Sequence, residues 1–261
     1  EFDFIDQIFK ENVSDEVVGS DVRGEKVPLP VVMGSLIKTY IGDETMKWVR
    51  KNGWLNETFV ITDKQAGNSG ALDYNNSGIF SISYSRGNGI EGADTSRHLK
   101  KMNIPNNAGM KCIIRTEIEM DDDTFFNNQH NLLKKDGTPY ENPRNYVSGK
   151  MNAETSPDWF YENVRVFGTS VVQPEMSKID QLEFMKKMGF DIPEYIVVKG
   201  HELTDEFLSA YLTERREKLK RKSAIDGIVI DINDVAIRTK VGLKENSKNP
   251  DYARKFKIPD E

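Results

Sequence analysis

Short apolar runs broken by turn residues are the feature of this sequence that most restricts its fold. Runs at residues 59–61, 71–74 and 79–82 follow one another, and an Asn-Asn-Ser-Gly turn separates the second from the third. Apolar runs of this length, flanked by turn residues, are typical of strands joined as hairpins. We therefore predict that residues 59–84 form strands paired as a hairpin.

More strands and two helices are predicted further along the chain. Alternating or short apolar runs predict strands at residues 112–118, 164–167 and 228–230. A Ser-x-x-Asp box and a closing glycine predict a helix at residues 177–188, and apolar spacing predicts another at residues 204–222. The strands and helices do not alternate in β-α-β order, so we predict an α+β fold with antiparallel sheets and flanking helices.

Composition excludes several classes of protein. The chain has 261 residues with 36 Lys and Arg against 42 Asp and Glu, so any site for a polyanion has to be a local patch. No apolar run approaches the roughly 20 residues that cross a bilayer. The single cysteine, Cys112, excludes an internal disulfide and a cysteine-based zinc site. A reducing compartment fits, and we predict a cytoplasmic location, in a bacterium or a phage-infected host cell.

Residues 1–26 are acidic and weakly patterned, so we predict an N-terminal extension there and one domain over residues 27–261. Within that domain, Lys64 ends an apolar run and Gly67 follows three positions later. A strand end fixes the lysine Cα, and a glycine lets a phosphate-bearing ligand approach the backbone. On this pattern alone, a solvated surface lysine remains the commoner interpretation.

Four other segments carry candidate functional groups. The glycine-rich stretch 85–94 offers backbone N–H groups and the Arg86 guanidinium to a phosphate or ribose, although a plain hairpin loop has the same composition. Residues 142–150 form a polar loop or an ordinary turn. An Asp-Gly pair opens the strand at 228–230, and alternation places Lys255 and Lys257 on one face.

The order of these segments resembles the motif series of covalent polynucleotide ligases and capping enzymes, and most closely the adenylation domain of NAD-dependent DNA ligases. The family patterns are approximately Lys-x-Asp-Gly, Thr-Arg-Gly-Asp-Gly, Arg-Gly-Glu, Asn-Pro-Arg-Asn, Asp-Gly-Val-Val-Ile-Lys and Lys-Phe-Pro. The matching segments here are 64–67, 85–89, 115–117, 142–149, 226–233 and 255–256. The resemblance covers about residues 28–258 and implies the nucleotidyltransferase fold.

The resemblance also implies a reaction and a set of site residues. Lys64 would attack the α-phosphate of NAD to form a covalent lysyl-AMP, AMP would pass to the 5′-phosphate of a nick in double-stranded DNA, and the 3′-hydroxyl would then displace AMP. The residues implied to bind the nucleotide are Ser35, Leu36, Thr62, Arg86, Glu117, Phe167, Asp226, Lys255 and Lys257. Mg²⁺ would be held by Glu117 and Asp226, and DNA would be contacted by Arg144, Arg216 and Lys220.

Three positions depart from the family pattern. Ala66 stands where the family has Asp, Thr62 where it commonly has Glu, and Asp231 where it has Lys. We expect Ala66→Asp to speed adenylation, because the Asp of the family pattern accepts hydrogen bonds and helps to fix the lysine loop. The alternative is that the three departures are mutually adapted, and Ala66→Asp would then slow the reaction.

Two other functions remain open from the sequence. They are an ATP-dependent DNA or RNA ligase, and a non-catalytic homologue that binds nucleotide or DNA. The Asn-Pro-Arg-Asn segment at residues 142–145 favours NAD as the donor. The resemblance identifies no OB-fold domain within this sequence, so a separate OB-fold domain or subunit is a candidate partner.

Overall fold

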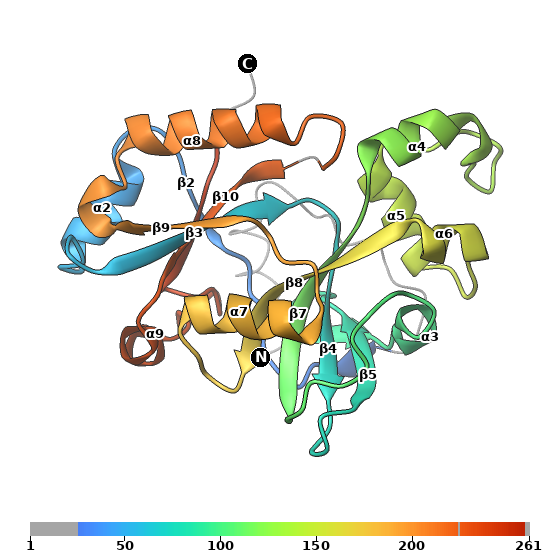
Figure 1. The fold of residues 1–261 in the computed structure, drawn as a ribbon, viewed down its shortest axis with the longest axis horizontal. Coiled ribbons are helices and arrows are strands. Elements are labelled where there is room, and N and C mark those ends of the chain that lie inside the picture. The colour runs from blue at the N-terminus through green and yellow to red at the C-terminus, as the bar shows by residue number, and fades with distance from the viewer. Residues whose placement is uncertain (1–25, 224, 259–261) are drawn as a thin grey trace.

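The computed structural model describes residues 26–223 and 225–258, which form two larger sheets, a small two-stranded sheet and surrounding helices (Figure 1). The predicted N-terminal extension falls almost wholly outside the described residues. The strands are β1 (Lys26–Pro28), β2 (Ile37–Thr39), β3 (Thr58–Gln65), β4 (Asn68–Tyr74), β5 (Phe80–Ser85), β6 (Glu91–Ala93), β7 (Cys112–Met120), β8 (Val164–Gln173), β9 (Tyr195–Lys199), β10 (Ile225–Ile232) and β11 (Ala253–Phe256).

Most of the helices are short and lie on the outer sides of the sheets (Figure 1). They are α2 (Glu44–Lys51), α3 (Ser96–Leu99), α4 (Asp122–Asn128), α5 (Pro143–Met151), α6 (Asp158–Glu162), α7 (Lys178–Met188), α8 (Asp205–Lys218) and α9 (Val235–Val241). Among the described residues, no helix is long and apolar enough to span a membrane.

The first larger sheet has five strands in the order β2-β11-β10-β3-β9, and α2 and α8 lie beside it (Figure 1). Its pairings are antiparallel except for the parallel pair β2 and β11. Alternate residues of β3 and β10, such as Phe59 and Ile230, are fully buried and pack with Trp48 and Leu212 from the helices. This core lies between the sheet and the helices, so the opposite face of the sheet points away from the helices.

The second larger sheet has four antiparallel strands in the order β5-β4-β7-β8. Its core joins Tyr74 and Ile114 from the strands to Phe125, Tyr146 and Phe160 from the helices. Each larger sheet therefore has its own hydrophobic core, and the chain passes between the sheets after β3. The α+β prediction with antiparallel sheets and flanking helices is confirmed.

The predicted hairpin over residues 59–84 is half right. Strands β4 and β5 pair around the Asn-Asn-Ser-Gly turn, as predicted. Strands β3 and β4 do not pair, because β3 joins the five-stranded sheet and β4 joins the other one. The polar interval expected to be a turn belongs to the ends of β3 and β4 themselves, and the chain passes from one sheet to the other at Ala66 and Gly67. Short-range patterning does not distinguish such a passage from a turn.

The starts of both predicted helices are confirmed, and so is the end of α7. The Ser177 side chain accepts from the Asp180 N–H at the start of α7, and Gly189 closes that helix with a φ of 104°. Helix α8 begins after its Thr204 cap as predicted, but it ends at Lys218, before residue 222. The interpretation of residues 142–150 as a loop was wrong. Asn142 caps α5 there by accepting from the Asn145 N–H.

Candidate active site

A cleft of about 1320 Å³ opens between the two larger sheets. Its walls include Lys64 and Lys255 from the five-stranded sheet and Arg115 and Glu117 from the four-stranded sheet. The sequence-predicted residues that line this cleft are Ser35, Leu36, Thr62, Lys64, Arg86, Glu117, Arg144 and Lys255. Residues that lie far apart in the sequence thus meet on both walls of one cleft.

Lys64 forms an ion-paired triad with two other predicted residues. Its Nζ lies 2.8 Å from Asp226 Oδ1, and Lys257 Nζ lies 3.1 Å from Asp226 Oδ2. Burial alone would raise the pKa of Asp226, but the two ammonium groups outweigh burial and lower it. Asp226 therefore stays ionised and holds Lys64 at the end of β3. The side chain of Lys64 is 23% exposed, so it remains open to the cleft.

Two carboxylates of β7 hold the backbone that follows Lys64. Glu117 Oε1 accepts from the Gly67 N–H at 3.0 Å, and Glu119 Oε1 accepts from the Ala66 N–H at 2.7 Å. Burial raises the pKa of Glu117, against the opposing effects of Lys64 and the Gly67 N–H. Burial also raises the pKa of Glu119, to about 7.

Gly67 is required by close packing between backbones. A Cβ at Gly67 would lie 2.1 Å from the Ile118 carbonyl oxygen, so no other residue fits without moving β7. The sequence interpretation assigned this glycine to the approach of a ligand. The structure shows that it lets the chain cross from β3 to β4 directly against β7.

The glycine-rich stretch 85–94 forms a tight turn that aims Arg86 into the cleft. Gly87 has a φ of 52°, and a Cβ there would collide with the Glu91 carbonyl oxygen. Arg86 donates through Nη2 to the Ser35 hydroxyl and through Nε to the Met33 carbonyl at 3.3 Å. The turn and the segment containing Ser35 therefore form one wall of the cleft.

Asp231, where the family pattern has lysine, sits in a buried ion-pair cluster. Arg238 Nη1 lies 2.9 Å from Asp231 Oδ1, and Lys178 Nζ lies 3.6 Å from Asp231 Oδ2. Lys178 also donates to the Thr169 carbonyl at 2.8 Å. Burial lowers the pKa of Lys178, and Asp231 opposes that shift. Helix α7 thus brings an ammonium group next to the position where the family pattern has its lysine.

Five predicted residues are not among those that line the cleft. Asp226 and Lys257 reach the site through the ion-paired triad with Lys64, and the other three, Phe167, Arg216 and Lys220, lie apart from it. Phe167 is buried, pairs in register with Glu117, and carries the Arg165 guanidinium 4.7 Å above its ring. Arg216 and Lys220 lie on and just beyond α8, on the outer side of the five-stranded sheet, and Lys220 pairs with Glu217 at 3.6 Å. The geometry brings most of the predicted nucleotide residues and Arg144 to one cleft, and leaves Phe167, Arg216 and Lys220 apart from it.

Arg215, one of the basic residues in the last turn of α8, has a structural role. Its side chain is only 4% exposed and donates to both oxygens of Asp63, at 2.9 Å and 2.6 Å. Asp63 directly precedes Lys64. This buried pair therefore anchors the end of β3 to α8. The Arg215 side chain does not belong to the solvent-exposed face of the helix.

The predicted Mg²⁺ carboxylates both lie around Lys64, although no cluster of three metal-binding side chains occurs within residues 26–223 and 225–258. Mg²⁺ commonly takes one or two carboxylates and fills its shell with water and substrate phosphates. Glu117 and Asp226 fit that pattern of binding.

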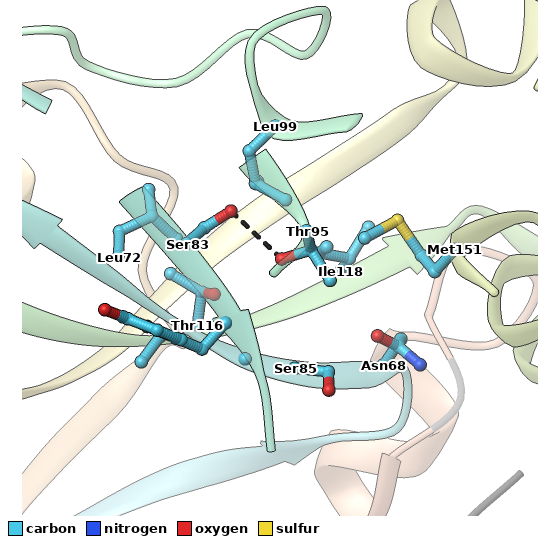
Figure 2. A pocket seen from close by; sticks show the side chains of 12 residues that line it. Asn68, Leu72, Ser83, Ser85, Thr95, Leu99, Thr116, Ile118 and Met151 are labelled. Carbon is cyan, nitrogen blue, oxygen red and sulfur yellow. Dashed lines mark hydrogen bonds between the residues drawn. The ribbon is translucent and has the colours of Figure 1, made fainter. Parts of the chain in front are cut away.

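A second, much smaller cavity lies within the four-stranded sheet region, where Leu72, Thr116 and Ile118 line it (Figure 2). Its volume is about 10 Å³, which is about the room that one water needs. Thr116 lines it, and its Oγ1 has no hydrogen-bond partner among the residues that the structure describes. Ser83 and Thr95, which also line it, share a hydrogen bond of 2.9 Å. It is too small for a substrate, so the cleft is the candidate active site.

The sequence interpretation missed Glu119, Ser223 and Lys178. Glu119 had a usable signal, because residues two apart on a strand share a face and Glu117 was already a candidate. Ser223 and Lys178 had none, since a serine between a helix and a strand and a lysine at a helix start are common surface residues. Only the tertiary fold brings them to the site.

Comparison with known proteins identifies the family of this chain. Residues 23–261 match the family model described as the NAD-dependent DNA ligase adenylation domain. A DNA ligase of Acanthamoeba polyphaga mimivirus is 30% identical over 270 residues, covering 98% of this chain and 38% of the viral protein. A DNA ligase of Thermosipho africanus is 31% identical over 251 residues, covering 90% of this chain and 36% of that protein.

The fold also has a counterpart among solved structures. An RNA ligase of Naegleria gruberi superposes with a TM-score of 0.50 at 8% identity, covering 94% of this chain and 62% of that chain. At this identity the likeness concerns the fold alone. The present chain spans well under half the length of the curated DNA ligases that it matches. The family match covers nearly the whole chain, and the chain therefore belongs to the NAD-dependent DNA ligase adenylation domain family.

Proposed function

We propose that this chain catalyses the adenylation step of DNA ligation with NAD as the donor. The observation that carries the proposal is Lys64, which is held 2.8 Å from Asp226 at the edge of a cleft lined by further cations. The Lys64 nitrogen would form a bond to the α-phosphorus of NAD. The pyrophosphate P–O bond would break, and nicotinamide mononucleotide would leave with the electron pair.

The surrounding charges suit this displacement at phosphorus. A lysine amine has to lose its proton before it attacks, and nearby positive charge favours the neutral form. Lys257 is placed for this role because it shares Asp226 with Lys64, and Lys255 lines the same cleft. Arg86 and Arg115 on the opposite wall would stabilise charge on the phosphates. Stacking of adenine on Phe167, which the sequence resemblance implied, is not part of this proposal, because that ring is buried and does not line the cleft.

Bound Mg²⁺ would supply additional positive charge at the phosphates, with Glu117 and Asp226 as its protein ligands. The carboxylate of Asp226 serves Lys64 and Lys257 in the described structure. Glu117 uses one oxygen for the Gly67 N–H. Support for the magnesium proposal is the position of both carboxylates next to Lys64.

The second substrate would be nicked double-stranded DNA, which receives AMP on its 5′-phosphate. Arg144 at the start of α5 lines the cleft and is the best-placed of the proposed DNA contacts. Arg216 and Lys220 would contribute only if DNA also passes along α8. With a formal net charge of −6, the chain should bind DNA weakly and in a salt-dependent way. A separate OB-fold domain or subunit is the partner we propose for firm binding.

The test is the intact mass of the protein after incubation with NAD and Mg²⁺, with ATP and Mg²⁺, or with neither. We expect one added AMP with NAD and none without a donor. An adduct formed with ATP alone would favour the ATP-dependent alternative. The absence of any adduct with both donors would favour a non-catalytic homologue.

A further inference from the structure

We infer that Glu119 is a positioning residue for the nucleophile, because its carboxylate holds the backbone corner formed by Ala66 and Gly67 and thereby aims Lys64 into the cleft. This inference rests on the adenylation function proposed above. Neither the motif series nor the family match assigns a role to this position. The argument depends on the hydrogen bonds of one buried side chain.

Glu119 has few degrees of freedom left. It is 7% exposed, and its Oε1 accepts from the Ala66 N–H at 2.7 Å. Its Oε2 accepts from the Ser223 hydroxyl at 2.7 Å. The amide of Gln65, oriented so that its nitrogen donates, lies 2.9 Å from Oε1 and 3.1 Å from Oε2. The two carboxylate oxygens are thus engaged by three donors.

These donors come from two segments that both lead to the reacting group. Gln65 and Ala66 directly follow Lys64 at the end of β3. Ser223 lies in the connection from α8 to β10, three residues before Asp226, the ion-pair partner of Lys64. Glu119 therefore links the backbone that carries the nucleophile to the backbone that carries its carboxylate partner.

The side chain of residue 66 cannot provide this link, because alanine has no hydrogen-bonding group. Glu117 holds the next N–H of the corner at 3.0 Å, so adjacent backbone amides rest on two carboxylates of β7. The charged groups that act on Glu119 are Glu117 on β7 and Arg165 on the neighbouring strand β8. A reacting group misplaced by about 1 Å can lose on the order of 100-fold in rate.

The experiment compares Glu119→Met, which removes both acceptors, with Glu119→Gln, which keeps one carbonyl oxygen for the Ala66 N–H. Single-turnover adenylation is followed at increasing NAD concentration in the presence of Mg²⁺. We expect Glu119→Met to lower the saturating rate by on the order of 100-fold with little change in half-saturation. Glu119→Gln should recover most of the rate. Glu162→Gln, an exposed carboxylate change on α6, is the matched control and should leave the rate unchanged.

A second measurement follows backbone amide exchange at residues 66 and 67 in the same variants. We expect protection to fall at least tenfold in Glu119→Met and to persist in Glu119→Gln. Circular dichroism confirms that each variant is folded, and Ser223→Ala provides a milder variant with a loss of a few fold in rate.

Three results would overturn the inference. They are a wild-type saturating rate in folded Glu119→Met, a loss confined to NAD half-saturation, and a Gln variant as slow as the Met variant. If the wild-type protein forms no adduct with NAD or ATP, the proposed function fails. The exchange measurement then decides the positioning inference by itself, because unchanged protection in Glu119→Met would refute it and lost protection would support it.

Discussion

The two walls of the cleft treat their carboxylates in opposite ways. On the five-stranded sheet, Asp226 meets the ammonium groups of Lys64 and Lys257, and its pKa falls below the ordinary value. On the four-stranded sheet, Glu117 and Glu119 are held mainly by neutral N–H and O–H donors, and burial raises the pKa of both. Asp226 is thus held by ion pairs, whereas Glu117 and Glu119 accept hydrogen bonds from backbone amides.

This difference separates a carboxylate that pairs with the nucleophile from carboxylates that hold the backbone in place. An ion pair at a partly open edge holds a lysine in place and leaves its side chain accessible from the cleft. A buried carboxylate that accepts from backbone amides fixes the chain but is costly to ionise. The five-stranded sheet therefore supplies the nucleophile and its ion-pair partners, and the carboxylates of the four-stranded sheet fix the backbone that follows the nucleophile. Each prediction below changes one side of this comparison.

The largest effect is expected for Lys64→Ala. The adduct with AMP should be abolished, because no other amine occupies the end of β3, while the fold should persist because the side chain is partly exposed. Intact mass spectrometry after incubation with NAD measures the adduct, and thermal unfolding checks the fold. A normal adenylated species in this variant would refute the assignment of the nucleophile.

Arg215→Met should show how much the loss of the buried pair between Arg215 and Asp63 lowers the free energy of unfolding. Removal of Arg215 takes the guanidinium partner away from the buried Asp63 side chain, so the free energy of unfolding should fall by about 3–5 kcal/mol. Lys218→Met is the matched control on the same helix. Lys218 pairs with Glu194 at the surface, and its loss should cost no more than about 1 kcal/mol. Equal losses in urea denaturation would contradict a structural role for Arg215.

The raised pKa of Glu119 predicts a pH dependence of stability. Its folded-state pKa of about 7 exceeds the ordinary value of 4.5, so folding favours the protonated form. The resulting contribution is present below pH 4.5 and is lost as the pH rises through 7. It amounts to roughly 3 kcal/mol when each pKa unit is worth about 1.4 kcal/mol.

Glu119→Gln should remove this dependence and leave the variant more stable than the wild type at pH 8. Urea denaturation of both proteins between pH 5 and pH 8 measures the difference. Parallel stability curves would show that Glu119 does not titrate in this range. The prediction also contrasts with Asp226, whose lowered pKa keeps it ionised throughout the same range.

Lys257→Met should slow adenylation by about 10- to 100-fold with little loss of adenosine affinity, because its proposed action is on the phosphate and on Lys64. Single-turnover rates and adenosine binding separate the two effects. Lys187→Met on the exposed side of α7 is the control. A loss of affinity with an unchanged rate would place Lys257 in binding alone.

The sequence predicted the elements that carry strong local signals. Ser177 and Gly189 marked the ends of α7 because a cap and a left-handed glycine act within a few residues. Motif order predicted that Lys64 and Asp226 belong to one site, although they are far apart in the chain. The separation of β3 from β4 was missed, because the partner of a strand depends on which distant strand offers a free edge.

Supporting residues were harder to predict than reacting ones. Lys178 reaches Asp231 only because α7 packs near β10, and Ser223 reaches Glu119 only because the connection after α8 passes over β7. These contacts depend on packing between elements and leave no periodic pattern in the sequence. The sequence showed that Ala66 and Asp231 depart from the family pattern. It did not show that Glu119 lies at Ala66 and Lys178 at Asp231.

The smallest effect concerns Ala66, where the sequence favoured a faster reaction for Ala66→Asp and left a slower one as the alternative. The structure favours the slower one. The Ala66 N–H already has a carboxylate acceptor in Glu119, and Glu117 holds the Gly67 N–H, so the corner does not lack a negative group. Ala66→Asp would add a third carboxylate beside these two and near Lys64. The added charge would favour the protonated, unreactive form of the lysine.

We therefore expect Ala66→Asp to slow single-turnover adenylation about tenfold at pH 7, with the deficit shrinking as the pH rises. Ala66→Asn, which adds a similar volume without charge, is the control and should lose less. If Ala66→Asp instead speeds the reaction at every pH, the corner does need a carboxylate at residue 66. In that case, Glu119 would be only a partial substitute, and the division of labour between the two walls would be incomplete.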